Sequence, residues 1–268
     1  NVDQAPVVLR RHRNNDGAVP SSKTKLEAIA RARHDSTVAW GAFNCWNAMA
    51  SLVLEPLVTA VWIVSATLAS RSGLDLSRAL LVFPLLELFV MVFHCCLVCS
   101  IKRLLVGKFR PGDHAFYGRY HYKWVVALLL TRSLKPLLDA KLKGTPFMSL
   151  VYRAFGAQVG KDCCIMSSSV EYDLIEFGDR CAVGFHVTLQ PHTVEHMVIK
   201  LGDFRVTGNN TALRHLSAIM PDTEIEQGGQ LLENSLLPKG CVVNRGATWA
   251  GLPGKEVVFD SRRRKKLP

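Results

Sequence analysis

A six-residue period runs through the second half of the sequence and constrains the fold more than any other feature. At steps of six from Val159 to Trp249 stand sixteen positions, of which thirteen are apolar. Of the fifteen positions that lie four residues after these, from Cys163 to Ala247, twelve are small. Internal periods of this kind indicate repeat architectures, in which each unit packs on its neighbours. The phase continues without a gap, so we expect sixteen hexads in about five stacked coils.

Three hexads make an 18-residue triangular coil, with the bulky aliphatic side chain inside and the small residue beside it. Coils stack at the strand spacing of about 4.8 Å, so residues 18 apart become vertical neighbours. Cys163 and Cys181 are 18 apart, and we expect them to be stacked core thiols. An antiparallel β-domain would instead show period two, with turn residues every 8 to 12 positions. The sequence therefore predicts a parallel β-helix over residues 155–256.

Two long apolar stretches precede the repeats. Residues 48–69 contain Glu55 as the only charge, and residues 79–101 contain only Glu87. Each is long enough to cross the roughly 30 Å hydrocarbon core as a helix, and the short loop between them predicts a hairpin. Acidic groups and His94 within such spans should face a partner helix. Two buried helices of a soluble α-domain are the alternative.

The charge distribution predicts topology. The formal net charge is 33 − 22 = +11, with basic residues flanking both apolar stretches. Basic flanks favour the cytoplasmic side. We therefore expect a multi-pass membrane protein with both ends and the β-helix cytoplasmic, and membrane lipid as a partner. No module for nucleic-acid binding is present, and the eight cysteines show neither a disulfide framework nor the spacing of a zinc site, so no metal is expected. The expected organisation is a basic flexible tail (1–39), a two-helix transmembrane region (40–103), an interfacial connector (104–154), the β-helix (155–256) and a basic tail (257–268).

Six short motifs carry a family resemblance. They are GKFRPG at 107–112, KGTPF at 143–147, FGAQVG at 155–160, EYDLI at 171–175, LQPH at 189–192 and WAGLP at 249–253. With the hexapeptide phase, they resemble the left-handed parallel β-helix of hexapeptide-repeat acyltransferases. More narrowly, they are similar to the membrane-embedded C-terminal region of nonribosomal peptide synthetase-like proteins, the ε-poly-L-lysine synthetase group.

The resemblance implies an all-β left-handed parallel β-helix preceded by an α-helical transmembrane hairpin. It also implies transfer of an acyl or aminoacyl group to an amine or hydroxyl. The donor would be acyl-CoA or the phosphopantetheine thioester of a carrier-protein domain, and trimers are expected. Family members carry more spans, an adenylation domain and a carrier, and this chain lacks an initiator Met, so we expect a partial member or fragment. A non-catalytic β-helical platform that docks a carrier domain or a membrane complex is the alternative.

The resemblance also supplies a candidate site. A histidine on the outside of such a helix acts as general base, and His192, three residues after Leu189, is the match; His186 and His196 are the alternatives. Asn210 lies one full coil after His192 in the count, so we expect it to be the vertical neighbour. Glu171 and Glu195 break the aliphatic phase, and Asp173 lies in a matched motif, so these three carboxylates complete the predicted catalytic set.

The end of the repeats is a second candidate. Trp249, Gly251 and Pro253 resemble the segment that lies along the pantetheine arm of the donor in related acyltransferases. A simple end-cap turn is the alternative.

Overall fold

A computed structural model describes residues 27–29, 31, 37–71, 73 and 76–258. The described residues form two compact units. One contains Lys143–Thr193 and the described residues from Leu201 onward, and the other contains the described residues of 17–142 together with Val194–Lys200. Nearly all of the predicted terminal tails (1–39 and 257–268) lie outside the described residues.

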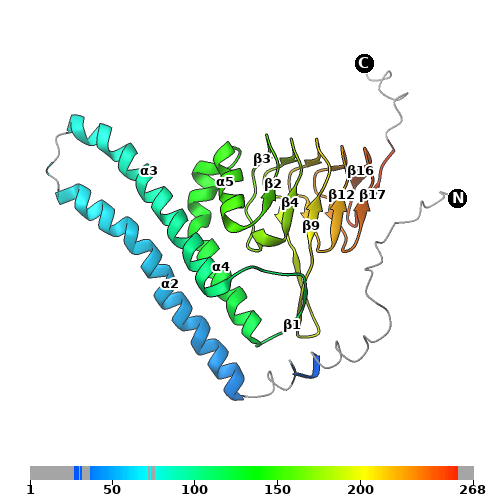
Figure 1. Cartoon of the computed structure of the whole chain (residues 1–268), viewed down its shortest axis with the longest axis horizontal. Coiled ribbons are helices and arrows are strands. Elements are labelled where there is room, and N and C mark those ends of the chain that lie inside the picture. Colours follow the sequence, from blue (N-terminus) through cyan, green and yellow to red (C-terminus); the bar gives the residue numbers. More distant parts are fainter. Residues whose placement is uncertain (1–26, 30, 32–36, 72, 74–75, 259–268) are drawn as a thin grey trace. The chain divides into compact units, whose positions relative to one another are not determined.

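The first unit is a coil of short strands on three parallel sheets, which confirms the predicted parallel β-helix (Figure 1). One sheet contains β2 (Gln158–Val159), β4 (Ile175–Phe177), β9 (Phe204–Val206), β12 (Thr223–Ile225) and β15 (Val242–Val243). The second contains β3 (Cys164–Ile165), β5 (Ala182–Val183), β10 (Ala212–Leu213), β13 (Gln230–Leu231), β16 (Thr248–Ala250) and the antiparallel β17 (Lys255–Glu256). The third contains β6 (Thr188–Leu189), β11 (Ala218–Ile219) and β14 (Leu236–Leu237).

The hexad positions form the core of the coil. Aliphatic positions such as Ile165, Ile225 and Leu237 are fully buried. Cys163 and Cys181 are also buried, one coil apart, which confirms them as core thiols. Burial raises the pKa of the Cys181 thiol to about 11, so this thiol is protonated and unreactive at neutral pH.

The expectation that all sixteen hexads stack as successive coils is wrong at one place. Ala212 pairs with Gln230 at the regular spacing of one coil, whereas the preceding pair, Ala182 with Ala212, is separated by one coil and two further hexads. An insertion of two hexads therefore interrupts the coils. The chain leaves at Pro191, whose carbonyl accepts a hydrogen bond of 2.9 Å from the returning Gly202 N–H. In the second and third sheets the insertion is a whole number of hexads, so β10, β11 and the later strands keep the phase of the earlier ones. In the first sheet β9 is one residue out of phase, since Glu176 pairs with Arg205, 205 − 176 = 29 residues on, and β12 restores the phase.

The corners of the coil use left-handed backbone. One corner has positive φ in five successive coils, at Asp162, Arg180, Asn210, Gly228 and Gly246, with φ between 53° and 72°. Asparagine, aspartate and glycine tolerate this region best. Residues at this corner are thus selected for backbone conformation as well as for chemistry.

The helix α5 (Pro146–Phe155) packs against the first coil. Pro146 stands at its first turn, where no backbone donor is lost. The buried Tyr152 ring meets the Tyr172 ring edge to face, with centroids 4.8 Å apart. Tyr172 opens the short 3₁₀ helix η3 (Tyr172–Leu174), so α5 holds the segment that follows Glu171.

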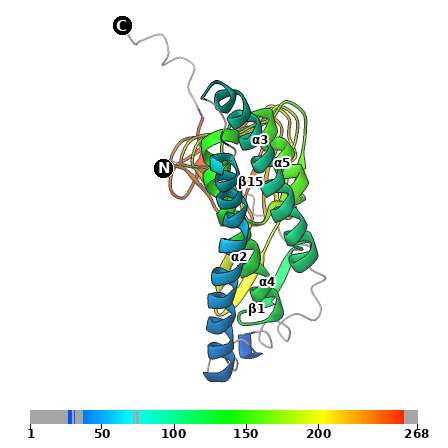
Figure 2. The same cartoon turned by 90° about the vertical axis from the view of Figure 1, so that its left-hand side faces the viewer.

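The second unit is mainly helical. Its elements are α2 (Thr37–Arg71), α3 (Leu76–Ile101), the π-helical η1 (Lys102–Val106), β1 (Gly112–Ala115), α4 (Arg119–Leu137) and the π-helical η2 (Leu138–Leu142). The insertion forms the hairpin of β7 (His192–Glu195) and β8 (Val198–Leu201), and β8 also pairs with β1. Figures 1 and 2 both show α2 running beside α3, with α4 against α2.

Among the described residues, one helical stretch, Val82–Val106, is long and apolar enough to cross a membrane. It is 22% buried and contains most of the second predicted span. The first predicted span lies in α2, where many side chains, including that of Glu55, lie outside the described set. The two-helix transmembrane hairpin therefore stays a prediction from the sequence. Glu87 forms an ion pair with Lys141, and the buried His94 lies 3.5 Å from the Ser133 hydroxyl.

Candidate functional site

The structure brings together two of the predicted site residues, His192 and Glu171. The imidazole Nδ1 lies 2.7 Å from Oε1 of Glu171. The glutamate side chain is 2% exposed, whereas the imidazole is 20% exposed. A buried carboxylate is costly unless it is paired, so this contact offsets the cost of placing Glu171 at a core position and leaves one side of the imidazole accessible.

Glu171 occupies an inward, aliphatic position of the first coil. The backbone before it is tied down by Ser167 and Ser169, whose hydroxyls donate to the carbonyls of Val187 and Leu189 in the next coil. The backbone after it turns into η3, where Leu174 N–H donates to the Glu171 carbonyl at 3.1 Å. The carboxylate is therefore held by a fixed backbone.

His192 stands where the chain leaves the coil. It follows the buried Pro191 and is the first residue of β7. Its partner Glu171 lies one coil and three residues earlier in the sequence. The sequence shows the spacing of Glu171 and His192. It does not show that the carboxylate of Glu171, which stands at an inward position, reaches the histidine at the corner of the coil.

The predicted stacking of Asn210 on His192 is wrong. Asn210 lies beyond the two-hexad insertion, and its N–H donates to the Asp179 carbonyl at 3.0 Å. Its side-chain Oδ1 accepts a hydrogen bond of 2.8 Å from Nε of Arg180. Asn210 also has φ 60°, so the left-handed corner accounts for the amide residue at this position.

The other predicted carboxylates have different neighbours. Glu195 forms an ion pair with Lys200 across the β7–β8 hairpin, within the second unit. Asp173 is half-buried in η3, and its carboxylate lies so close to Gly156 that a Cβ there would overlap Oδ1. The alternative histidines His186 and His196 are both exposed at positive φ.

The predicted donor-binding residues close the β-helix. Trp249 is 5% exposed and lies in β16, and Gly251 follows with φ 101°. The Gly251 N–H donates to the Ser235 hydroxyl at 3.0 Å, and its carbonyl accepts from Leu236 N–H at 2.9 Å. Pro253 follows a cis peptide bond. These contacts form an end cap, which is compatible with either function proposed for the segment.

A shallow groove of about 290 Å³ lies on the outer face of the second sheet. Gly184 forms part of its floor, and His215, Arg214 and Glu233 line its edge, where Arg214 and Glu233 pair at 3.2 Å. Hexapeptide counting did not predict this groove. Over the residues that the structure describes, no group of three or more His, Cys, Asp or Glu side chains is arranged to hold a metal ion.

His192 Nδ1 and the Glu171 carboxylate lie at ion-pair distance, and an imidazole beside a buried carboxylate is the pairing that a general base with an orienting carboxylate needs. A carboxylate that accepts the Nδ1–H keeps the proton on Nδ1, so Nε2 is the ring nitrogen that can take up a second proton. It also stabilises the imidazolium formed when Nε2 takes up a proton. The arrangement can therefore remove a proton from a bound amine or hydroxyl.

Comparisons with known proteins find weak similarities. No family model matches the chain. The Delta-poly-L-ornithine synthetase of Acinetobacter baumannii is 25% identical over 175 residues, which are 64% of this chain and 13% of that protein. The chain thus spans only a small part of this relative.

Solved structures with some similarity include two acetyltransferases. The serine acetyltransferase of Neisseria gonorrhoeae is 13% identical, with 90% of this chain and 94% of that chain covered and a TM-score of 0.33. A mutant of the GDP-perosamine N-acetyltransferase of Caulobacter crescentus, in complex with CoA and GDP-perosamine, is 10% identical, with 39% and 51% covered and a TM-score of 0.28. The β-helix assignment rests on the strand pairing in this chain.

Proposed function

We propose that this chain is an acyltransferase unit that moves an acyl or aminoacyl group from a thioester to an amine or hydroxyl. The observation that carries the proposal is the 2.7 Å contact between His192 Nδ1 and the buried Glu171 carboxylate. A carboxylate in place of a core aliphatic residue is the kind of local exception that proteins make at functional sites.

In this reaction His192 acts as general base. The acceptor N–H or O–H gives its proton to Nε2 while the acceptor atom forms a bond to the thioester carbonyl carbon. The C–S bond then breaks, and the leaving thiolate takes the proton from the imidazolium. Glu171 stays in ion-pair contact with Nδ1 throughout and is a positioning residue. Because a thioester is already a reactive donor, the chain needs chiefly to position and deprotonate the acceptor.

The donor is proposed to be acyl-CoA or the phosphopantetheine thioester of a carrier-protein domain. The similarity to a poly-ornithine synthetase favours an aminoacyl group within a peptide synthetase-like system. The end cap around Trp249, Gly251 and Pro253 is proposed to contact the pantetheine arm. The long apolar helix α3 supports a membrane anchor, with the predicted topology that keeps both chain ends and the β-helix cytoplasmic.

A left-handed coil and a homotrimer are parts of the same proposal. In a trimer, the outer groove beside Gly184 and His215 would face a neighbouring copy and enlarge the space open to substrates. Cross-linking of the full chain in detergent should then give trimers, and a ladder that stops at the monomer would contradict this part.

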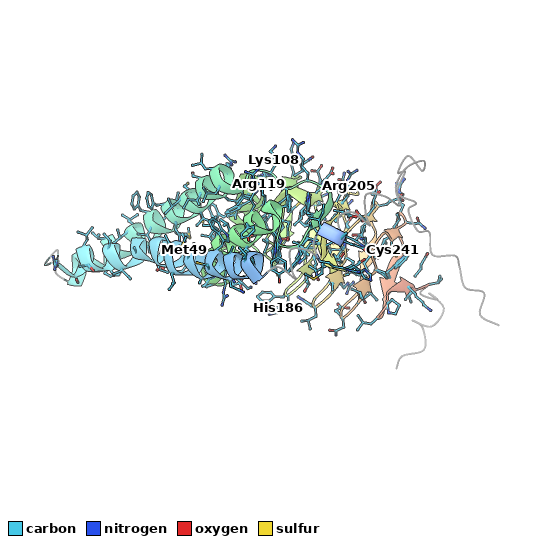
Figure 3. The ribbon with its side chains drawn as sticks, turned by 90° about the horizontal axis from the view of Figure 1, so that it is seen from below. Met49, Lys108, Arg119, His186, Arg205 and Cys241 are labelled. Carbon is cyan, nitrogen blue, oxygen red and sulfur yellow. The ribbon has the colours of Figure 1, made fainter. Side chains whose placement is uncertain are left out.

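Thiol release by the full chain tests the function. Acyl-CoA and a loaded carrier domain are supplied separately with amine and hydroxyl acceptors, and the His192→Asn variant is compared with wild type. The matched control is His186→Asn, because His186 projects from the β-helix (Figure 3) and asparagine tolerates its φ of 55°. We expect a loss of about 10²- to 10⁴-fold for His192→Asn and none for the control. Equal release by all three proteins would contradict the role of His192 as general base, and no release by any of them would favour the non-catalytic platform.

A further inference from the structure

A second cavity lies in the helical unit. Its volume is about 300 Å³. It is lined by the start of α2, η1 and the first two turns of α4, through Trp46, Leu105, Arg119, Tyr122, Lys123 and Val126. The Trp46 and Tyr122 rings meet edge to face, with centroids 6.0 Å apart. The cavity thus combines two aromatic rings, two aliphatic side chains and two cations.

The cavity lies at one end of the apolar helix. Leu105 is the last residue but one of the candidate membrane span Val82–Val106. Leu104 is 84% exposed, Leu105 is 54% exposed and Trp46 is 39% exposed. Exposed leucines beside tryptophan and tyrosine are typical of the level at which a helix leaves the hydrocarbon region and enters the headgroups. If α3 spans a membrane, this cavity opens at headgroup depth.

The segment that supplies most of the lining is basic. Between positions 102 and 123 the sequence has six Lys and Arg residues and one acidic residue, Asp113. Within the described part of the chain, Arg119 is exposed and forms no ion pair, and Lys123 Nζ makes only a long hydrogen bond of 3.4 Å to the Val106 carbonyl. Figure 3 places Arg119 and Lys108 at the end of the helical unit that lies away from the α2–α3 connection. Both cations at the cavity therefore have donors to offer an anion.

We propose that this cavity binds the headgroup of one anionic phospholipid. Arg119 and Lys123 contact the phosphate, and the glycerol and the first acyl carbons lie against Leu105, Val126 and the two rings. A small free anion would satisfy the cations but leave the apolar walls in water, so an amphiphile fits the lining better. This inference rests on the membrane placement proposed above, and does not depend on the acyl transfer.

Native mass spectrometry of the full chain in detergent tests the site. Phosphatidylglycerol and phosphatidylcholine are added in turn, and the ratio of the two bound fractions is measured. We expect Arg119→Gln to lower the preference for phosphatidylglycerol by about fivefold and Arg119→Gln/Lys123→Gln to lower it further. The matched control is Arg132→Gln, which removes the same kind of exposed charge from the second half of the same helix. It should keep the wild-type ratio.

Two further arms separate the possible sources of the anion. Inorganic phosphate and glycerol 3-phosphate are offered as competitors, and neither should displace phosphatidylglycerol at equal concentration. Displacement by phosphate would overturn the lipid assignment. An equal effect of Arg132→Gln and Arg119→Gln would overturn the site in favour of general surface charge. Flotation with vesicles of either lipid reports membrane placement separately: a chain that never floats contradicts the membrane proposal itself, and with it this site.

Discussion

Nδ1 of His192 lies 2.7 Å from Oε1 of Glu171. Glu171 occupies a position where the six-residue period predicts an aliphatic side chain. Neighbouring positions of the same phase hold Ile165 and Phe177, both buried. The pair therefore replaces hydrophobic packing with an ionisable contact at the place where the coil is interrupted.

This replacement predicts that the pair contributes more to activity than to stability. We expect Glu171→Leu to change the melting temperature little, because the apolar packing that leucine adds at this core position is offset by the loss of the contact partner of the buried His192 Nδ1. Acyl transfer should fall, because His192 loses the group that orients it. Thermal unfolding and thiol release of the same sample give both values. A variant that unfolds earlier and keeps full activity would show that the pair is structural.

The close stacking of coils predicts a severe effect at Gly208. A Cβ there would overlap the backbone nitrogen of Gln227, so the backbone itself must move. We expect Gly208→Ala to lower the free energy of unfolding by about 3 kcal/mol or more. The control is Gly240→Ala, which meets open space at φ 73° and should cost only about 1–2 kcal/mol for the left-handed backbone. Equal melting temperatures for the two variants would contradict the stacking.

The helical unit should lose stability in acid. Burial lowers the pKa of His121, which is 3% exposed, to about 4, and burial also lowers the pKa of His114. Below the unfolded value of about 6.5, the unfolded chain therefore binds more protons than the folded chain, so stability falls as the pH drops from about 6.5 towards 4. For His121 the difference reaches about 3 kcal/mol. Thermal unfolding at a series of pH values measures it, and His121→Gln should flatten the profile. An unchanged profile in this variant would assign the acid sensitivity to other groups.

The period predicted most of the β-helix because burial and stacking depend on residue type and spacing alone. Ile225 and Leu237 had to be inside, and Cys163 had to lie over Cys181. The length of the insertion makes it invisible in the six-residue pattern of the sequence. Because two whole hexads preserve the phase, Leu201 and Glu195 were counted as coil positions although they belong to the hairpin of β7 and β8.

The insertion also determines which of the predicted site residues lie together. Glu171 precedes the insertion and His192 is the first residue of it, so no inserted residue separates them and the structure joins them. Asn210 lies on the other side, and its partner is Arg180. Pairing across a loop depends on where the chain returns to the coil, and residue counting carries no information about that.

A double-mutant cycle on acyl transfer tests the central claim most directly. Thiol release is measured for wild type, His192→Asn, Glu171→Gln and the double variant, each shown to be folded by thermal unfolding. If Glu171 acts through His192, the double variant should be no slower than His192→Asn alone, since residues that act as a unit are not additive. Losses that multiply, so that the double variant is slower by the product of the two single effects, would contradict the pair as a catalytic unit.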